Sequence, residues 1–112
     1  MKSKALKFIL DIESVISEIE VIILKTEGNF FNFRDNFIYK RAAERDLEII
    51  GEAIRKLLEI DPSLKISSVK KIIGLRNLIS HAYDSIEDEL IWGIINRDIP
   101  MLKKEIEKIK SA

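Results

Sequence analysis

The chain has 112 residues, with 19 lysine and arginine side chains balanced by 19 aspartate and glutamate side chains, and it has no cysteine. The absence of cysteine excludes disulfides, zinc sites built on thiolates and cysteine nucleophiles. Because the charges cancel, the chain as a whole gives no reason to expect tight, non-specific binding to nucleic acid, and any such contact must be local. No stretch rich in proline, glycine or serine divides the chain, so we expect one domain over residues 1–112.

The N-terminal segment lacks the pattern of a signal peptide. Lys2, Lys4 and Lys7 precede a short apolar patch, but Asp11 and Glu13 interrupt it at once. No apolar run approaches the length that crosses a bilayer. We therefore expect a cytoplasmic protein that makes no contact with a membrane.

Two long segments repeat apolar residues at helical spacing. Ser3 is the candidate N-cap of the first, whose apolar positions are Ala5, Phe8, Ile9, Ile12, Val15, Ile16, Ile19, Ile22 and Ile23. Turn-forming residues at 28–32 interrupt this pattern, and a second long helix is predicted from about Phe33 to Ile60. Asp61-Pro62 ends it, because proline disfavours helix in the residue before it and has no backbone N–H to donate.

Three shorter helices are predicted in the remainder. A serine at position 67 or 68 caps a helix that extends through Ile79. A Ser-x-x-Asp sequence at 85–88 resembles a capping box and begins a short helix, and Asp98 and Pro100 open the last one. No segment alternates polar and apolar residues as a strand does. The predicted fold is all-α, an up-and-down bundle of about five helices, two of them long.

The segment Arg76-Asn-Leu-Ile-Ser-His81-Ala-Tyr83 is the first candidate for chemistry. His81 is the only histidine, and imidazole exchanges a proton near neutral pH while the arginine keeps its charge. At about 100° per helical residue, Arg76, Ser80 and Tyr83 share one face, whereas His81 points about 140° from Arg76 and lies above Asn77. The two groups converge if the helix loosens, if the arginine swings round, or if a second subunit completes the site across a two-fold axis. Paired core residues are the alternative.

The first helix favours the arrangement with a second subunit. It is apolar over more of its circumference than one core face requires, because Leu6, Leu10, Val21 and Leu24 lie outside that face. Such a surplus often marks an interface.

Charged residues near the segment are supporting candidates with two interpretations each. Lys70 and Lys71 belong to a group of cations just upstream of the segment, which either faces phosphate or matches the dipoles of the helix ends. Glu48 and Glu52 repeat at a spacing of four on the second helix, which is typical of a solvated face with ion pairs. Alternatively, one of them meets Arg76 and sets its orientation.

The sequence resembles a known protein family. The sequence Arg76-x4-His81-x-Tyr83 matches the R-x4-H-x-Y signature of the HepT toxins, members of the HEPN superfamily. The flanking sequence is similar as well, at Arg41–Ala53, at Ile73–Ile79, and at Ile91-Trp92 followed by Asp98-Ile-Pro100. The chain departs from many relatives before the third helix, where Ser67-Ser68-Val69 stands in place of a nearby tryptophan.

The resemblance implies a HEPN-like homodimer that cleaves RNA without a metal or cofactor, with Arg76 and His81 as the catalytic pair in a cleft at the subunit interface. It also implies that Tyr83 is the residue to which a nucleotidyltransferase antitoxin of the MNT type adds AMP from ATP. The chain would then be the toxin of a type VII (HEPN/MNT) toxin–antitoxin system.

The chemistry suits these residue types, and two other functions stay open. RNA supplies its own nucleophile, the 2′-hydroxyl, so the protein needs only to move protons and stabilise charge on the phosphate. His81 could act as base or acid, and Arg76 could hold phosphate oxygens by paired hydrogen bonds. The near-zero net charge lends weight to a non-catalytic helical dimer that serves a nucleotidyltransferase as its substrate-binding subunit. The third hypothesis is a structural dimerisation domain without activity.

Overall fold

The computed structural model describes residues 3–67, 69–80 and 88–112, and over 75–80 it describes only the course of the helix. In chain order the elements are α1 (Ser3–Lys25), α2 (Phe30–Arg34), α3 (Phe37–Ile60), α4 (Val69–Ser80), α5 (Asp88–Gly93), the π-helical turn η1 (Ile94–Asp98) and α6 (Ile99–Ser111). The described residues contain no strand, which confirms the predicted all-α bundle. None of the described helices combines the length and apolar character needed to cross a bilayer.

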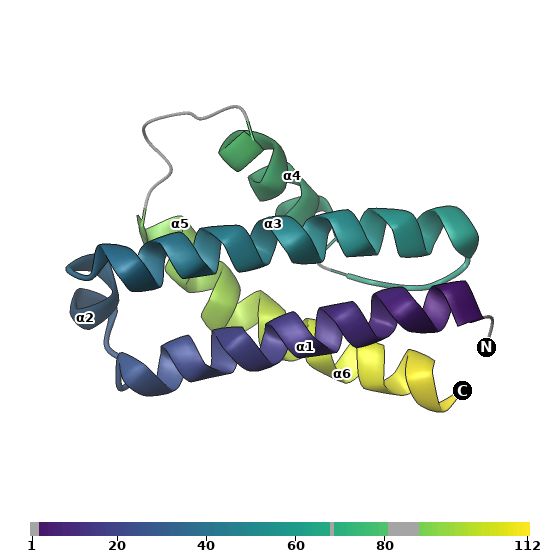
Figure 1. The fold of residues 1–112 in the computed structure, drawn as a ribbon, viewed down its shortest axis with the longest axis horizontal. Helices are drawn as coiled ribbons and strands as arrows, with labels where there is room; N and C mark the ends of the chain where they lie inside the picture. Colours follow the sequence, from purple (N-terminus) through teal and green to yellow (C-terminus); the bar gives the residue numbers. More distant parts are fainter. Residues whose placement is uncertain (1–2, 68, 81–87) are drawn as a thin grey trace.

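Two long antiparallel helices, α1 and α3, form the centre of the bundle (Figure 1). The short helix α4 packs against α3 on the side away from α1, while α6 crosses and packs against α1. The chain ends lie near each other at one end of the bundle, and α2 and α5 pack together toward the other end. This arrangement separates α4 from α1 by the thickness of α3.

The core is built from the isoleucine and leucine stripes of these helices. Side chains at helical spacing on one face of α1 and one face of α3 are fully or almost fully buried, namely Ile9, Ile12, Ile16, Ile19, Leu47, Ile50, Ile54 and Leu57. Ile91, Ile94, Leu102 and Ile106 continue the same cluster through α5, η1 and α6. The apolar periodicity of the sequence therefore identifies the packed faces.

The end of α1 shows why the first helix stops where it does. Thr26 is buried, and its Oγ1 donates to the carbonyl oxygens of Ile22 and Ile23 at 2.8 and 3.1 Å, in addition to the backbone N–H groups of Thr26 and Gly28 that these oxygens accept. Glu27 and Gly28 then adopt positive φ angles of 58° and 64°. Glycine takes this conformation at no steric cost, so Gly28 suits the turn.

The predicted start of the second long helix at Phe33 is wrong, because two asparagine caps divide this region. Asn29 Oδ1 accepts from the backbone N–H groups of Phe31 and Asn32 and begins α2. Asn36 Oδ1 accepts from Ile38 and Tyr39 and begins α3. Each asparagine satisfies N–H groups that a helix start leaves without partners.

The short helix α2 closes this end of the bundle with an aromatic cluster. Phe33 is fully buried, and its ring centroid lies 5.0 Å from that of Trp92. Phe30 lies 6.2 Å from the same indole. Trp92 is thus a packing residue that links α5 to α2.

The last helix, α6, begins at Ile99 as predicted, with Asp98 at its N-cap position and Pro100 in its first turn. The chain stays helical from Asp88 to Ser111 through η1, and the Asp98 side chain makes no capping hydrogen bond. Its carboxylate is buried and lies 3.8 Å from Lys71 Nζ of α4 and 3.8 Å from Arg97 Nη2. Asp98 thus precedes the helix as predicted, but its carboxylate meets a tertiary partner in place of a capping hydrogen bond.

Candidate active site

The described part of the candidate site is carried by α4. Arg76, Asn77 and Ser80 lie on this helix, and Ser80 is its last residue. His81 and Tyr83 lie outside the described residues. The convergence of Arg76 with His81 therefore stays a prediction from the sequence, and what the structure adds is the way the helix that carries Arg76 is held.

Two contacts fix α4 on the bundle. Ile72 is fully buried in the core, and Val69 and Ile73 are half-buried beside it. Lys71 reaches the buried carboxylate of Asp98 at the junction of η1 and α6. These anchors hold the first two turns of α4, directly before Arg76.

The two lysines upstream of Arg76 have different surroundings. Lys71 is engaged with Asp98, whereas Lys70 is exposed and has no ion-pair partner among residues 3–67, 69–80 and 88–112. Of these two candidates, Lys70 is the one without an ion pair in the described part of the chain.

Glu48 and Glu52 line a shallow groove of about 250 Å³ between α1 and α3, together with Lys7 and Phe8 of α1. Glu48 pairs with Arg45 at 3.5 Å. Glu52 pairs with Arg55 at 2.6 Å and lies 3.9 Å from Lys56. Hydrogen bonds and charge from Glu52 raise the pKa of the Arg55 guanidinium above its ordinary value. Both carboxylates thus take part in ion pairs along α3, as the solvated-face interpretation predicts. The alternative, that one of them orients Arg76, stays a prediction.

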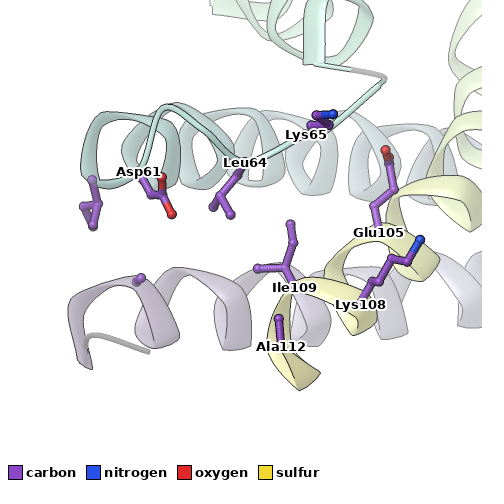
Figure 2. Close-up of a pocket in the computed structure, with 9 residues that line it drawn as sticks. Asp61, Leu64, Lys65, Glu105, Lys108, Ile109 and Ala112 are labelled. Atoms are coloured by element: carbon purple, nitrogen blue, oxygen red, sulfur yellow. The ribbon is translucent and has the colours of Figure 1, made fainter.

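One cavity lies away from α4. It has a volume of about 820 Å³ and is formed by the start of α1, the end of α3, the segment that leads to α4, and α6 (Figure 2). Ile60, Leu64 and Ile109 contribute apolar surface, and Lys65 and Glu105 stand at its edge. Glu48, Glu52, Lys70 and Lys71, the predicted site residues with described side chains, do not line it. Its walls come from four separate segments, so no local sequence pattern could have revealed it.

Sequence reasoning also missed a buried carboxyl between the two long helices. Asp46 of α3 is buried, and its Oδ2 has no hydrogen-bond partner among the described residues. Burial first, and then the nearby carboxylate of Glu18 on α1, raises the pKa of Asp46 to about 7. Within the described residues, no group of three or more histidine, cysteine, aspartate or glutamate side chains is placed to hold a metal ion.

Comparison with known proteins supplies the family. Residues 9–109 match the family described as "Ribonuclease HepT-like". The chain is 38% identical over 90 residues to "Putative RNase MJ1380" of Methanocaldococcus jannaschii, an alignment that covers 79% of this chain and 82% of that protein. It is 35% identical over 101 residues to "Putative RNase TTE0752" of Caldanaerobacter subterraneus subsp. tengcongensis, covering 88% and 89%.

A further relative carries the name of the toxin that the signature suggested. It is "Probable ribonuclease HepT" of Thermococcus cleftensis, 30% identical over 73 residues, with 62% of this chain and 64% of that protein covered. No solved structure matches the chain. The family match spans nearly all of the chain, and Arg76, His81 and Tyr83 lie inside it. The chain therefore belongs to the HepT-like ribonucleases of the HEPN superfamily.

Proposed function

We propose that this protein is the toxin of a HEPN/MNT toxin–antitoxin system, a cytoplasmic endoribonuclease that acts as a homodimer without a metal ion. The observation that carries the proposal is the Arg76-x4-His81-x-Tyr83 signature, which begins on an anchored helix in a chain that matches the HepT-like family over residues 9–109. The names of the relatives, which describe them as RNases, support the same activity.

The cleavage step uses the 2′-hydroxyl of RNA as the nucleophile. His81 accepts the proton of this hydroxyl, the oxygen attacks the adjacent phosphorus, and the 5′-oxygen of the next nucleotide leaves with a proton from an acid. The products are a cyclic phosphate and a free 5′-hydroxyl. A second copy of His81 across the two-fold axis provides that acid, and Arg76 neutralises the charge that builds on the phosphate oxygens.

The structure supports this role for Arg76 by the way α4 is held. A guanidinium stabilises a transition state best when its helix does not have to be ordered during the reaction, because pre-organised charge requires no rearrangement. Ile72 and the Lys71–Asp98 pair anchor the turns that precede Arg76. Lys70, exposed on the same helix, extends the positive charge toward the RNA backbone.

Tyr83 is the proposed point of control. A nucleotidyltransferase antitoxin transfers AMP from ATP to the tyrosine hydroxyl, with release of pyrophosphate. The added nucleotide is bulky and negatively charged, so it blocks the site and repels an incoming phosphate.

The cleavage test compares the unmodified protein with Arg76→Ala and His81→Ala on total RNA in the presence of EDTA. We expect cleavage by the unmodified protein and its loss, by two orders of magnitude or more, in both variants. Arg34→Ala is the matched control, because Arg34 pairs with Asp35 on the exposed surface of α2 and should leave cleavage unchanged. Undiminished cleavage by the Arg76 or His81 variant would contradict the proposal.

The regulatory test is separate. After incubation with a nucleotidyltransferase of the MNT type and ATP, intact-mass spectrometry should show added AMP units, and Tyr83→Phe should abolish them. The chain has two tyrosines, so Tyr39→Phe is the matched control and should still be modified. Binding of the partner without AMP transfer or RNA cleavage would favour the alternative function, a non-catalytic subunit that serves the nucleotidyltransferase.

A further inference from the structure

The cavity between α6 and the segment that leads from α3 to α4 has aliphatic walls (Figure 2). Leu64 and Ile109 point toward one another across its middle, and Ile60 of α3 and Ala5 of α1 extend the lining. Its volume of about 820 Å³ lies within the range that small-molecule sites occupy. Ala112 lines the cavity and is exposed, so a ligand can enter from solvent.

The core uses only part of the aliphatic surface at this cavity. Ile60, Leu64 and Ile109 are half-buried and pack against the core, and the same three side chains line the cavity. An occupant that covers them with hydrocarbon gains free energy for each CH₂ group that leaves water. The cavity therefore favours a ligand with an aliphatic part.

One edge of the cavity carries a net positive charge. Lys65, Glu105 and Lys108 gather there (Figure 2), and two cations with one anion give a net charge of +1. Glu105 already accepts hydrogen bonds from the backbone N–H and the hydroxyl of Ser67, at 2.9 and 3.2 Å. The two ammonium groups make neither a hydrogen bond nor an ion pair in the part of the molecule that the structure describes. This edge is therefore suited to an anionic group.

The opposite side of the cavity is negative. Asp61 lies there (Figure 2), and its Oδ1 accepts hydrogen bonds from the backbone N–H and the hydroxyl of Ser63, at 3.1 and 2.6 Å. These bonds hold the carboxylate at this side, where it repels a second anionic group. The cavity thus favours a ligand with one negative charge, placed at the lysine edge.

We propose that this cavity binds a fatty-acid anion, with the carboxylate at Lys65 and Lys108 and the aliphatic chain between Leu64 and Ile109. The chain covers the half-buried side chains of the walls, and the carboxylate meets the two ammonium groups. A lysine ammonium is a compact charge on a flexible stem, so it can meet a carboxylate oxygen at an exposed edge without a fixed approach. The inference does not rest on the proposed function, because binding of the anion involves neither RNA nor Arg76.

The first test uses the unmodified protein and ligands that share one chain length. Decanoate, decanol, decylammonium and decanedioate are titrated by calorimetry below the concentrations at which they form micelles. Decanoate should bind tightest, because decanol lacks the charge, decylammonium reverses it, and decanedioate brings a second carboxylate toward Asp61. Octanoate should bind about fifteenfold more weakly than decanoate, since each buried CH₂ group contributes about fourfold. Equal affinity for decanoate and decylammonium, or no saturable binding of decanoate, overturns the proposal.

The second test locates the ligand on the unmodified protein. Decanoate should shift the backbone amide NMR signals of residues 60–65 and 105–112. Phe31 and Phe37 provide the internal control, because they are 59% and 70% exposed and do not line the cavity. Shifts that are concentrated at these phenylalanines would show that the chain binds to exposed aromatic surface, and they would overturn the assignment to the cavity.

A substitution that fills the cavity tests the same point. Leu64→Trp should weaken decanoate binding about tenfold or more, because the indole takes the volume in which the chain is buried. Ile38→Trp is the matched control, since Ile38 is 61% exposed and does not line the cavity. Its affinity should equal that of the unmodified protein. Undiminished binding by folded Leu64→Trp protein would contradict the proposal.

The third test concerns the carboxylate. Lys65→Gln and Lys108→Gln should each weaken decanoate binding by about two- to fivefold and leave decanol binding unchanged, because exposed ion pairs are weak. Both lysines are exposed, so the fold should persist. Lys104→Gln is the matched control, since Lys104 is also exposed on α6 but does not line this cavity. Unchanged decanoate affinity in the variant that lacks both Lys65 and Lys108 would overturn the placement of the carboxylate.

A last comparison separates this inference from the nuclease proposal. Arg76→Ala should lose RNA cleavage and bind decanoate as the unmodified protein does. Retained binding without cleavage supports both proposals, and retained binding with cleavage intact supports the cavity alone. Loss of decanoate binding on substitution of Arg76 would place the ligand at the nuclease site and overturn the separate cavity site.

Discussion

Lys71 of α4 directs its ammonium group toward the buried carboxylate of Asp98, at a distance of 3.8 Å. The pair connects the helix that carries Arg76 to the junction between η1 and α6, two segments far apart in the sequence. The ammonium is more than half exposed, so the interaction stabilises the fold only modestly. Its main effect is on where the first turns of α4 lie.

We predict energetic coupling between these two residues in a double-mutant cycle. Lys71→Met and Asp98→Asn should each destabilise the protein, and the double variant should be more stable than the sum of the single losses implies, by about 0.5–1 kcal/mol. Urea unfolding followed by circular dichroism provides the free energies. Lys70→Met is the matched control, and strictly additive losses for Lys71 and Asp98 would show that the pair contributes nothing.

Lys70 should contribute to RNA binding and not to the stability of the fold. It is exposed on α4 without a described ion-pair partner, so Lys70→Ala should leave the unfolding free energy within about 0.5 kcal/mol of the original. If it contacts a phosphate, the slope of log affinity against log salt for single-stranded RNA should fall by about 0.7. The measurement is a salt titration of binding by His81→Ala protein, which does not cleave the RNA.

The control for this titration is Lys25→Ala. Lys25 is also exposed, but it ends α1 on the far side of α3 from α4. Its removal changes the net charge by the same amount and should leave the slope unchanged. Equal effects of the two substitutions would point to a general charge effect and away from a phosphate contact at Lys70.

Asp46 should make the protein less stable as the pH rises from about 4 to about 7. Its pKa is about 7 in the folded protein against an ordinary value of 3.8, so the folded state retains a proton that the unfolded state has lost. Stability then falls with rising pH across this window, because the folded state binds more protons. Above pH 7 the buried carboxylate is charged beside Glu18, and the loss is complete.

Asp46→Asn tests this dependence, because the amide has the same shape and stays neutral. At pH 8 we expect the variant to be more stable by about 1–2 kcal/mol, and at pH 4 we expect little difference. Thermal unfolding at a series of pH values provides the measurement. Asp11→Asn serves as control, since Asp11 is half-exposed and paired with Lys7; a similar pH profile in that variant would argue against Asp46 as the cause.

Asn36 should stabilise the protein by capping the N-terminus of α3. Asn36→Ala removes the acceptor for the N–H groups of Ile38 and Tyr39 and should cost about 1 kcal/mol. Asn36→Ser keeps an acceptor at the same position and should recover most of that loss. Urea unfolding distinguishes the two variants, and equal destabilisation by alanine and serine would mean that the hydrogen bonds to the cap do not stabilise the helix.

The sequence predicted the long helices well where local signals decide the structure. The apolar spacing of α1 and the Asp61-Pro62 stop of α3 act within a few residues, so both can be recognised in a single chain. The cap at Asn36 was missed because Phe33 and Phe37 continue the helical spacing across the break. Phe33 in fact packs on Trp92, which is distant in sequence.

Tertiary partners explain the remaining differences. Asp98 stands at the start of α6, as aspartate before proline predicts, but only the fold brings Lys71 to its carboxylate. The raised pKa of Asp46 likewise depends on Glu18 of another helix. For the candidate site, the sequence predicted the residues and their helix, and the structure contributes the anchors of α4; the meeting of Arg76 with His81 stays a prediction.

The π-helical turn η1 has a consequence for how this chain tolerates changes in length. A π-helical turn holds one residue more than the α-helical turn it replaces. Asn96, in the middle of η1, donates from its side chain to the carbonyl oxygen of Trp92 in α5 at 2.9 Å. Removing one residue within 94–98 can convert the turn to ordinary α-helix while Trp92 and Leu102 keep their orientations. Between Ile99 and Glu105 the same deletion would rotate every later side chain by about 100° and turn Ile106 toward water. Homologues one residue shorter in this stretch are therefore expected to lack η1.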